Sequence, residues 1–291
     1  VSVAKEWGTT FYDLLHQQFA QVGEDGALLT RESASSYSVI GTGREGCDWM
    51  RARLQLKGRH DLYQVLGAII MPQPDRLVID IGFSADEVDG YVVALFDQRV
   101  AKSSTSSLED LSAHTHSIGD FPLPASIRVF AEHRDIAAQM LSAEVRSALS
   151  SQSELFERLH YTDYTHDDWD LPAVSKRTLH LVFRLPPSGQ MLRIQALVQM
   201  SFRLIDLIAH LKLSAPVRDK LREGRNRVAY LKFKEGHAER QELAQQRKAE
   251  KVVAARQKAP LADREAQRKR EEKEQRKADR KKGPRTKMKR I

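Results

Sequence analysis

The basic residues of this 291-residue chain are concentrated at its C-terminal end. The stretch from Arg218 to Ile291 holds 27 of the 47 Lys and Arg residues but only 12 of the 39 Asp and Glu residues, which gives it a net charge of +15. The rest of the chain, Val1 to Val217, holds 20 basic and 27 acidic residues, a net charge of −7. The sequence therefore predicts an acidic body and a basic arm. The charge of the arm favours a polyanionic partner, either nucleic acid or an anionic membrane surface.

Charge spacing predicts that the arm is helical. Glu265 with Lys269, and Glu272 with Arg276, stand four residues apart with the acid first, which stabilises an exposed helix. Between Ala262 and Lys287 the only apolar side chains are three alanines, so the segment lacks the apolar seam of a coiled coil. A solvated single helix and a disordered charged tail both remain open for this segment.

The fold class expected is α+β: a compact mixed globular domain followed by a long, highly charged basic helical arm. We place the domain at residues 1–213 and the arm at 214–291. The predicted apolar faces all precede Pro216, so the body is expected to fold without the arm. The single cysteine, Cys47, excludes an internal disulfide framework and is expected to behave as a small buried hydrophobe.

Hydrophobic periodicity gives the expected elements, and they interleave without a regular βαβ repeat. Loops are expected at 28–43 and 119–124 because these stretches are rich in Ser, Thr, Gly or Pro, and the Ser- and Thr-rich run at 103–107 is expected to break the pattern of the strands. Helices are predicted at 7–22, 48–56, 61–71, 135–149 and 191–213, and strands at 77–83, 91–96, 127–130, 155–161 and 178–185.

No segment of the sequence has the pattern of a membrane span. The apolar run from Val65 to Met71 is too short to cross a bilayer. The longer run from Met191 to Leu213 carries polar residues every three or four positions, which predicts an amphipathic helix packed on the body. The chain begins at Val1 without Met, and we expect it to be part of a longer protein.

Candidate chemical motifs in the body lack the spacing that catalysis or metal binding requires. The His and Asp candidates for metal ligation are His114, His116, Asp120, His160, Asp163, His166, Asp167, Asp168 and Asp170. They match neither a zinc-binding helix pair nor a calcium loop. Asp86 to Gly90 is interpreted as a turn, and the Gly-rich run from Gly41 to Gly46 follows a Ser-rich loop rather than a strand. We therefore predict no catalytic residue, no metal and no cofactor.

The order of residues along the arm and body nevertheless resembles a known family. In the arm the matching positions are Arg225-Asn226-Arg227-Val228, Leu231-Lys232, His237, Arg240-Gln241-Glu242, Ala244-Gln245, Arg247, Glu250-Lys251 and Lys287-Met288-Lys289. In the body they include Trp7, Leu14-Leu15, Val22 to Gly26, Gly43-Arg44, Cys47, Met71-Pro72, Tyr91-Val92 and Lys176 to Leu179. With these positions the chain resembles the calumin family, the coiled-coil domain-containing subunits of the PAT complex.

The resemblance implies a non-enzymatic chaperone or scaffold subunit that assists insertion of multi-spanning membrane proteins at the endoplasmic reticulum. Its implied partners are the ribosome near the exit tunnel, the Sec translocon, the small membrane partner Asterix and other subunits of the multipass translocon. This portion would face the cytosol. The family's single membrane span, and the acidic luminal segment to which calcium binding is ascribed, would precede Val1.

The charge pattern and the resemblance point to the same surface, a basic helix on ribosomal RNA. The residues expected to contact phosphate are Arg225, Arg227, Lys232, Lys234, Arg240, Arg247, Lys248, Lys251, Arg268, Lys269 and Arg276. The alternative for each is a charge that only keeps the helix soluble. At the level of function, the alternative is a soluble RNA-binding or ribosome-biogenesis factor, which would share the arm but need no membrane. A metal-dependent enzyme has no motif in its support.

Overall fold

The computed structural model of the chain describes residues 2–24, 26–57, 74–164, 177–258 and 268–277. It divides into two compact units, unit 1 from Val1 to Val228 and unit 2 from Ala229 to Ile291. Unit 1 contains the sheet and most of the helices. Unit 2 contains the greater part of one long helix, which begins in unit 1, and a second helical segment at residues 268–277. The predicted boundary after Leu213 remains a prediction.

Unit 1 is built on a ten-stranded sheet whose neighbouring strands pair antiparallel. The order of the strands is β1-β3-β4-β5-β10-β9-β6-β8-β7, with β2 paired to β3. The strands are β1 (Gln21–Val22), β2 (Thr30–Arg31), β3 (Ser36–Thr42), β4 (Trp49–Gln55), β5 (Arg76–Phe83), β6 (Val93–Asp97), β7 (His116–Ile118), β8 (Ile127–Ala131), β9 (Phe156–Thr162) and β10 (Arg177–Arg184).

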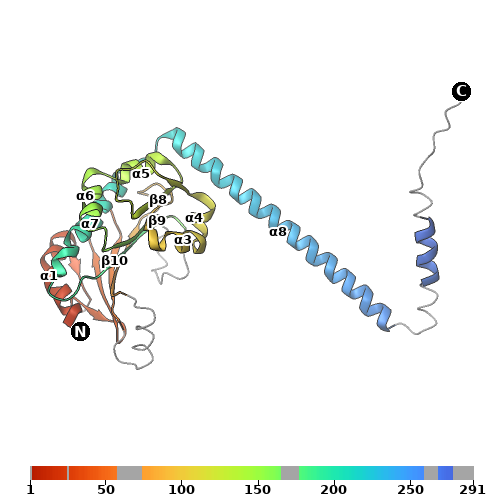
Figure 1. The fold of residues 1–291 in the computed structure, drawn as a ribbon, viewed down its shortest axis with the longest axis horizontal. Helices are drawn as coiled ribbons and strands as arrows, with labels where there is room; N and C mark the ends of the chain where they lie inside the picture. Colours follow the sequence, from red (N-terminus) through yellow and green to blue (C-terminus); the bar gives the residue numbers. More distant parts are fainter. Residues whose placement is uncertain (1, 25, 58–73, 165–176, 259–267, 278–291) are drawn as a thin grey trace. The chain divides into compact units, whose positions relative to one another are not determined.

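The described helices are α1 (Ser2–Gln18), α3 (Gln98–Ser107), α4 (Glu109–His114), α5 (Arg134–Met140), α6 (Ala143–Ser151), the 3-10 turn η2 (Met191–Ile194), α7 (Gln195–His210) and α8 (Ala215–Lys258). Those that lie wholly in unit 1 cover both faces of this sheet (Figure 1). The mixed α+β architecture expected from the irregular order of helices and strands is therefore present.

The larger core lies between one face of the sheet and helices α1, α5, α6 and α7. Alternate residues of β5, from Leu77 to Phe83, point into it because successive side chains of a strand face opposite sides. Trp7 of α1 and Leu204 of α7 are fully buried in the same cluster. The expected strand at 77–83 is confirmed, although nearly all residues of β5 are buried rather than those of one face alone.

The second face of the sheet is partly covered by α3 and α4. Val92, Ala94 and Phe96 pack there against Ala101 and Leu111 to form a smaller apolar cluster. The Ser- and Thr-rich run at 103–107, where a break in the strand pattern was expected, belongs to helix α3. Ser and Thr hydroxyls compete with the backbone for hydrogen bonds, but in α3 they donate to carbonyl groups three or four residues earlier and leave the helix intact.

Two further predictions fail at the β3–β4 edge of the sheet. The expected loop at 28–43 contains strands β2 and β3, and the expected helix at 48–56 is strand β4. The β4 sequence alternates buried Met50, Ala52 and Leu54 with half-buried arginines, which is the period of a strand with two unlike faces. This alternation is visible in the sequence, but the segment is so short that its apolar residues fit the spacing of a helix as well.

Helix boundaries differ from the expected ones in three places. The first helix ends at Gln18, and Val22 lies in β1. The expected helix at 135–149 is two helices, because the Ser142 hydroxyl accepts a hydrogen bond from the Val145 amide and caps α6. The expected helix at 191–213 is η2 followed by α7, and the expected helix at 61–71 lies outside the described residues. The remaining predicted strands are confirmed to within two residues at each end.

The arm contains helical structure wherever it is described. Helix α8 reaches Lys258, and a further helical segment covers 268–277. The predicted pair between Glu272 and Arg276 is present at 4.0 Å, while Glu265 lies outside the described residues. The arm as a whole, from 214 to 291, stays a prediction.

No single described helix is both long enough and apolar enough to cross a bilayer. Met191–His210 and Ala215–Lys234 meet the limits of length and composition only as a bent pair.

Candidate nucleic-acid interface

Most of the cations predicted to contact phosphate are exposed on α8. The exposed members are Arg227, Lys232, Lys234, Arg240, Arg247 and Lys251, and Arg268, Lys269 and Arg276 are exposed on the helical segment 268–277. Lys248 lies within α8, but its side chain is outside the described ones. Sequence reasoning thus selected cations that reach solvent, with one exception.

Part of this set shares a face of α8 within unit 2. Arg240, Arg247 and Lys251 are separated by seven and four residues, which is close to whole turns of a helix with 3.6 residues per turn. Their side chains therefore follow one line along the helix. Such a line can meet successive phosphates of a nucleic acid backbone without reading its bases.

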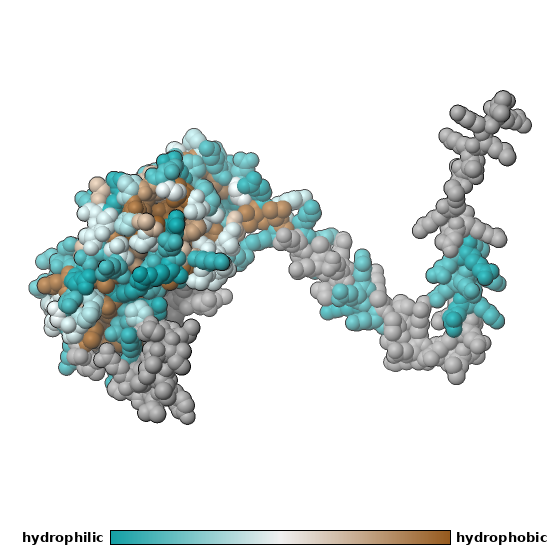
Figure 2. Space-filling model, in the orientation of Figure 1, coloured by the Kyte–Doolittle hydropathy of each residue, from teal (hydrophilic) through white to brown (hydrophobic). Residues whose placement is uncertain are grey.

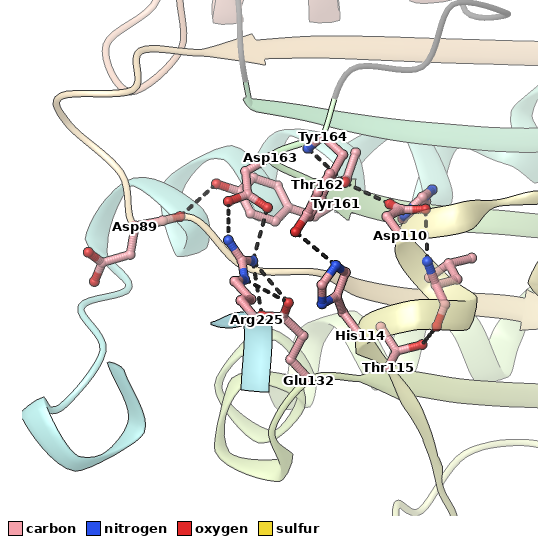
Figure 3. Close-up of polar contacts among 12 residues, drawn as sticks. Asp89, Asp110, His114, Thr115, Glu132, Tyr161, Thr162, Asp163, Tyr164 and Arg225 are labelled. Carbon is pink, nitrogen blue, oxygen red and sulfur yellow. Dashed lines mark hydrogen bonds and ion pairs between the residues drawn. The ribbon is translucent and has the colours of Figure 1, made fainter. Parts of the chain in front are cut away.

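The exception is Arg225, whose guanidinium lies between two carboxylates of the sheet (Figure 3). Its nitrogens donate to Glu132 at 2.9 to 3.1 Å and to Asp163 at 2.7 and 3.0 Å. The Arg225 guanidinium also stands 5.5 Å from the centre of the Tyr164 ring. Paired hydrogen bonds between a guanidinium and a carboxylate fix both the distance between the two groups and their relative orientation. Arg225 is thus a structural anchor of α8 in unit 1.

Neighbouring contacts hold the first turns of α8 to the same part of unit 1. Val217 and Leu221 are buried against the core, which differs from the expectation that all apolar faces precede Pro216. The Asp89 carboxylate accepts hydrogen bonds from the Leu213 amide at 2.9 Å and from Arg218 at 3.3 Å. We call Arg225, Glu132, Asp163 and Asp89 the anchor cluster.

The protonation of the anchor cluster is shifted by burial. The Glu132 side chain is 3% exposed, and burial raises the pKa of Glu132 to about 7, against the opposing charge of Arg225. Burial alone would lower the pKa of Arg225, but hydrogen bonds from it to Asp163 and the charge of Glu132 raise that pKa above its usual value. The guanidinium therefore stays charged, and Glu132 titrates near neutral pH.

Sequence reasoning did not find the carboxylates of the anchor cluster. Glu132 and Asp163 are separated from Arg225 by 93 and 62 residues. Nothing in the local sequence distinguishes Arg225 from the other arginines around it, so only the assembled sheet identifies its partners.

The candidate metal ligands lie in separate polar contacts rather than in one site. Buried His160 pairs with Asp110 of α4 at 2.9 Å, and His114 shares a hydrogen bond of 2.9 Å with the Tyr164 hydroxyl. The Asp163 carboxylate forms an ion pair with Arg225. His166, Asp167, Asp168 and Asp170 lie outside the described residues, and in the part of the chain that is described no three His, Cys, Asp or Glu side chains form a cation site.

A second buried polar group lies on β5 and its neighbours. Asp80 is fully buried and accepts hydrogen bonds from Arg53 at 3.1 Å and from His180 at 2.6 Å. Burial alone would raise the pKa of Asp80, but the His180 hydrogen bond and the charges of the adjacent cations lower it below the usual value. Cys47 is half-buried, and burial raises the pKa of its thiol to about 11, so the thiol stays protonated at neutral pH. Neither group supplies a reactive centre.

Fold and site together define an α+β sheet protein that anchors one end of a long basic helix, with its exposed cations beyond the anchor. The family model described as "PAT complex subunit CCDC47" matches residues 1–281, and the chain belongs to this family. Proteins named PAT complex subunit CCDC47 from Macaca fascicularis and Homo sapiens are each 28% identical over 275 residues. Those alignments cover 86% of this chain and 57% of each relative, so the chain spans little more than half of their length.

Similarity extends to a plant protein and, weakly, to a solved bacterial structure. An uncharacterized protein of Arabidopsis thaliana, At5g49945, is 26% identical over 245 residues, covering 78% of this chain and 50% of that protein. The crystal structure of the mycobacterial trehalose monomycolate transport factor A, TtfA, aligns with a TM-score of 0.34 and 11% identity, over 72% of this chain and 95% of TtfA.

Proposed function

We propose that this chain is part of a non-enzymatic PAT complex subunit at the endoplasmic reticulum membrane, that it faces the cytosol, and that its basic helix binds the ribosome. In this role it assists the insertion and folding of multi-spanning membrane proteins. Membership of a family whose members are named PAT complex subunits supports the complex. The ribosome contact is supported by one observation of the chain itself, the segregation of charge between its two units.

Unit 1 has 25 basic and 29 acidic residues, a net charge of −4, whereas unit 2 has 22 basic and 10 acidic residues, a net charge of +12. Like charge opposes the approach of unit 1 to RNA, and unit 2 is attracted to it over roughly a Debye length. Because ribosomal RNA helices are met mainly through phosphates and 2′-hydroxyls, a line of exposed cations is sufficient for contact without sequence specificity.

The contact residues proposed are the exposed cations of α8 and of segment 268–277, together with Lys248. Arg225 differs from them, because a guanidinium that satisfies two carboxylates within unit 1 would have to give up both pairs to reach a phosphate. Its proposed role is to fix where α8 starts.

The partners proposed for unit 1 are the Sec translocon, Asterix and other subunits of the multipass translocon. We also propose a membrane span in the part of the protein that corresponds to the portion of the relatives outside the alignment. A soluble RNA-binding or ribosome-biogenesis factor is the second candidate, favoured by the same basic helix but not by the family match.

Cosedimentation with ribosomes tests the proposal. The full chain is expected to pellet with ribosomes at low salt, and a chain ending at Val228, which keeps the anchor cluster, is expected to stay in the supernatant. Equal pelleting of the two would contradict the proposal. Fractionation of cells that express the natural full-length protein separates the two candidates, because a PAT complex subunit is expected with rough microsomes and a biogenesis factor with free or nuclear preribosomes.

A further inference from the structure

Aromatic side chains are exposed on α8 among its cations. Tyr230 is 66% exposed and Phe233 is 64% exposed, and both are outside the buried core. Figure 2 shows a brown, apolar patch on α8, the helix that carries Tyr230, Leu231 and Phe233 as exposed large hydrophobic residues. Side chains of this size are usually exposed for binding when several occur close together.

Three of the rings share one face of the helix. Tyr230, Phe233 and His237 have the spacing i, i+3 and i+7, which places them on one side within about 60°. The rings of Phe233 and His237 are in contact, with centroids 6.2 Å apart and planes inclined by 33°. Lys234 follows Tyr230 by four residues and Arg240 follows His237 by three, so cations lie on or beside the same line. We call Tyr230, Phe233, Lys234, His237 and Arg240 the ring-and-cation stripe.

The composition of the stripe selects among possible partners. A helix that lies in a membrane surface needs aliphatic and aromatic residues together on one face. Here Leu231, which is 51% exposed, follows Tyr230 directly and therefore points about 100° away from it. The stripe itself contains rings and cations but no large aliphatic residue. Rings that alternate with cations fit single-stranded RNA, whose bases stack on aromatic faces while its phosphates meet Lys and Arg.

We propose that the ring-and-cation stripe of α8 binds an unpaired stretch of RNA, with Tyr230 and Phe233 stacking on bases while Lys234 and Arg240 meet the flanking phosphates. The inference deepens the proposed ribosome contact and rests on it. It adds a preference for looped or single-stranded RNA, which contact with phosphates alone would not produce, because duplex bases are already stacked and paired. Stacking is tolerant of sequence, since every base has a flat face.

Binding of the full chain to two labelled RNAs tests this inference: a 12-nucleotide oligouridine and a duplex with the same number of phosphates per strand. The variant is Tyr230→Leu with Phe233→Leu, which keeps helix propensity and apolar character but removes both stacking faces. We expect its affinity for oligouridine to fall by about 25-fold or more, from about fivefold or more per lost stack. Affinity for the duplex should change less than twofold, and the slope of log affinity against log salt should stay the same because no charge is lost.

Matched variants separate stacking from other causes. Leu231→Ala removes an exposed apolar residue from another side of α8 and should bind oligouridine like the unchanged chain. Phe233→Trp keeps a flat ring and should retain full affinity. Helical circular dichroism of each variant should equal that of the unchanged chain, since the substituted side chains are exposed.

Three results would overturn the inference. In the first, the Leu double variant binds oligouridine as tightly as the unchanged chain while both still bind duplex RNA and ribosomes; the proposed function then stands and stacking fails. In the second, the double variant loses binding to vesicles of phosphatidylcholine and phosphatidylserine but not to oligouridine, which would make the stripe a membrane contact. In the third, the full chain binds neither RNA nor ribosomes, which would remove the inference together with the proposed function.

Discussion

Units 1 and 2 use the same charged residue types for different purposes. In unit 1 some arginines pair with buried carboxylates, as Arg53 does with Asp80 at 3.1 Å and Arg225 does with Glu132 at 2.9 Å. In unit 2 an ion pair such as that of Arg276 with Glu272 spans 4.0 Å between exposed side chains. A charged side chain that packs against the sheet is held in place by its ion-pair partner and helps to determine the fold. A charged side chain on a solvated helix acts mainly through the electrostatic field that it shares with its neighbours.

Helix α8 passes from one condition to the other along its own length. Its first turns contribute Val217, Leu221 and Arg225 to unit 1, and the later turns carry exposed cations. One helix therefore has an anchoring part and, in the proposed function, a binding part. The difference between them can be tested by removing each part separately.

The largest effect on stability is expected from a cut inside the anchoring part. A chain ending at Val228 should unfold cooperatively at nearly the temperature of the full chain, because none of the described side chains of unit 2 belongs to the buried core. A chain ending at Leu213 loses two buried apolar side chains and the Arg225 pairs, and should be less stable by about 5 kcal/mol or more. Chemical denaturation of the two truncated chains measures the difference. Equal stability would mean that the first turns of α8 are not part of the unit.

A smaller loss is expected when one arginine of the anchoring part is changed. Arg225→Ala leaves Glu132 and Asp163 as partly uncompensated carboxylates and should lower the free energy of unfolding by about 3 kcal/mol. The matched control is Arg222→Ala in the preceding turn, whose exposed pair with Asp219 contributes at most about 0.5 kcal/mol. Urea titrations at pH 8 give both values. Similar small losses for the two variants would show that the anchor cluster does not hold α8.

The pH dependence of unit 1 should reveal Glu132. Its pKa is about 7 in the folded chain, above the ordinary value of 4.5, so the folded state holds a proton that the unfolded state releases between these values. The free energy of unfolding should therefore fall as pH rises from about 4.5 to about 7, by about 2 to 3 kcal/mol, and level off above pH 7. Glu132→Gln should remove this fall, whereas the exposed Glu154→Gln should keep it. An identical pH profile for Glu132→Gln and the unchanged chain would exclude Glu132 as its source.

Strands with strong alternation could be predicted from the sequence, and those in short or mixed windows could not. The strand at 77–83 has four alternating apolar residues, and it was found at its true position. β4 alternates Met50, Ala52 and Leu54 with two arginines that form ion pairs with Asp80 of β5. In the sequence alone, without that partner, the arginines favour an exposed helix. The pairing of β4 with β5 in the folded chain outweighs this local preference.

The exposed cations of α8 were easier to predict than its anchoring part. Their exposure follows from local charge and helical spacing alone. Arg225 looks like its neighbours in sequence, and only the arrangement of β8 and β9 brings Glu132 and Asp163 to it. The sequence analysis assigned no role to Tyr230 and Phe233, and it is their exposure in the structure that distinguishes them.

The salt dependence of ribosome binding tests the central claim most directly, because each phosphate contact releases counterions. With about six contacts, raising salt from about 50 to 200 mM should weaken binding about a thousandfold. Replacing Arg247 and Lys251 by Gln removes two charges from the shared face of α8, and should make the slope of log affinity against log salt shallower by about two units. Replacing Lys220 and Arg222 by Gln removes the same charge from exposed positions in unit 1 and should leave the slope unchanged. A slope that is the same for both variants and the unchanged chain would contradict the claim that the cations of unit 2 hold ribosomal RNA.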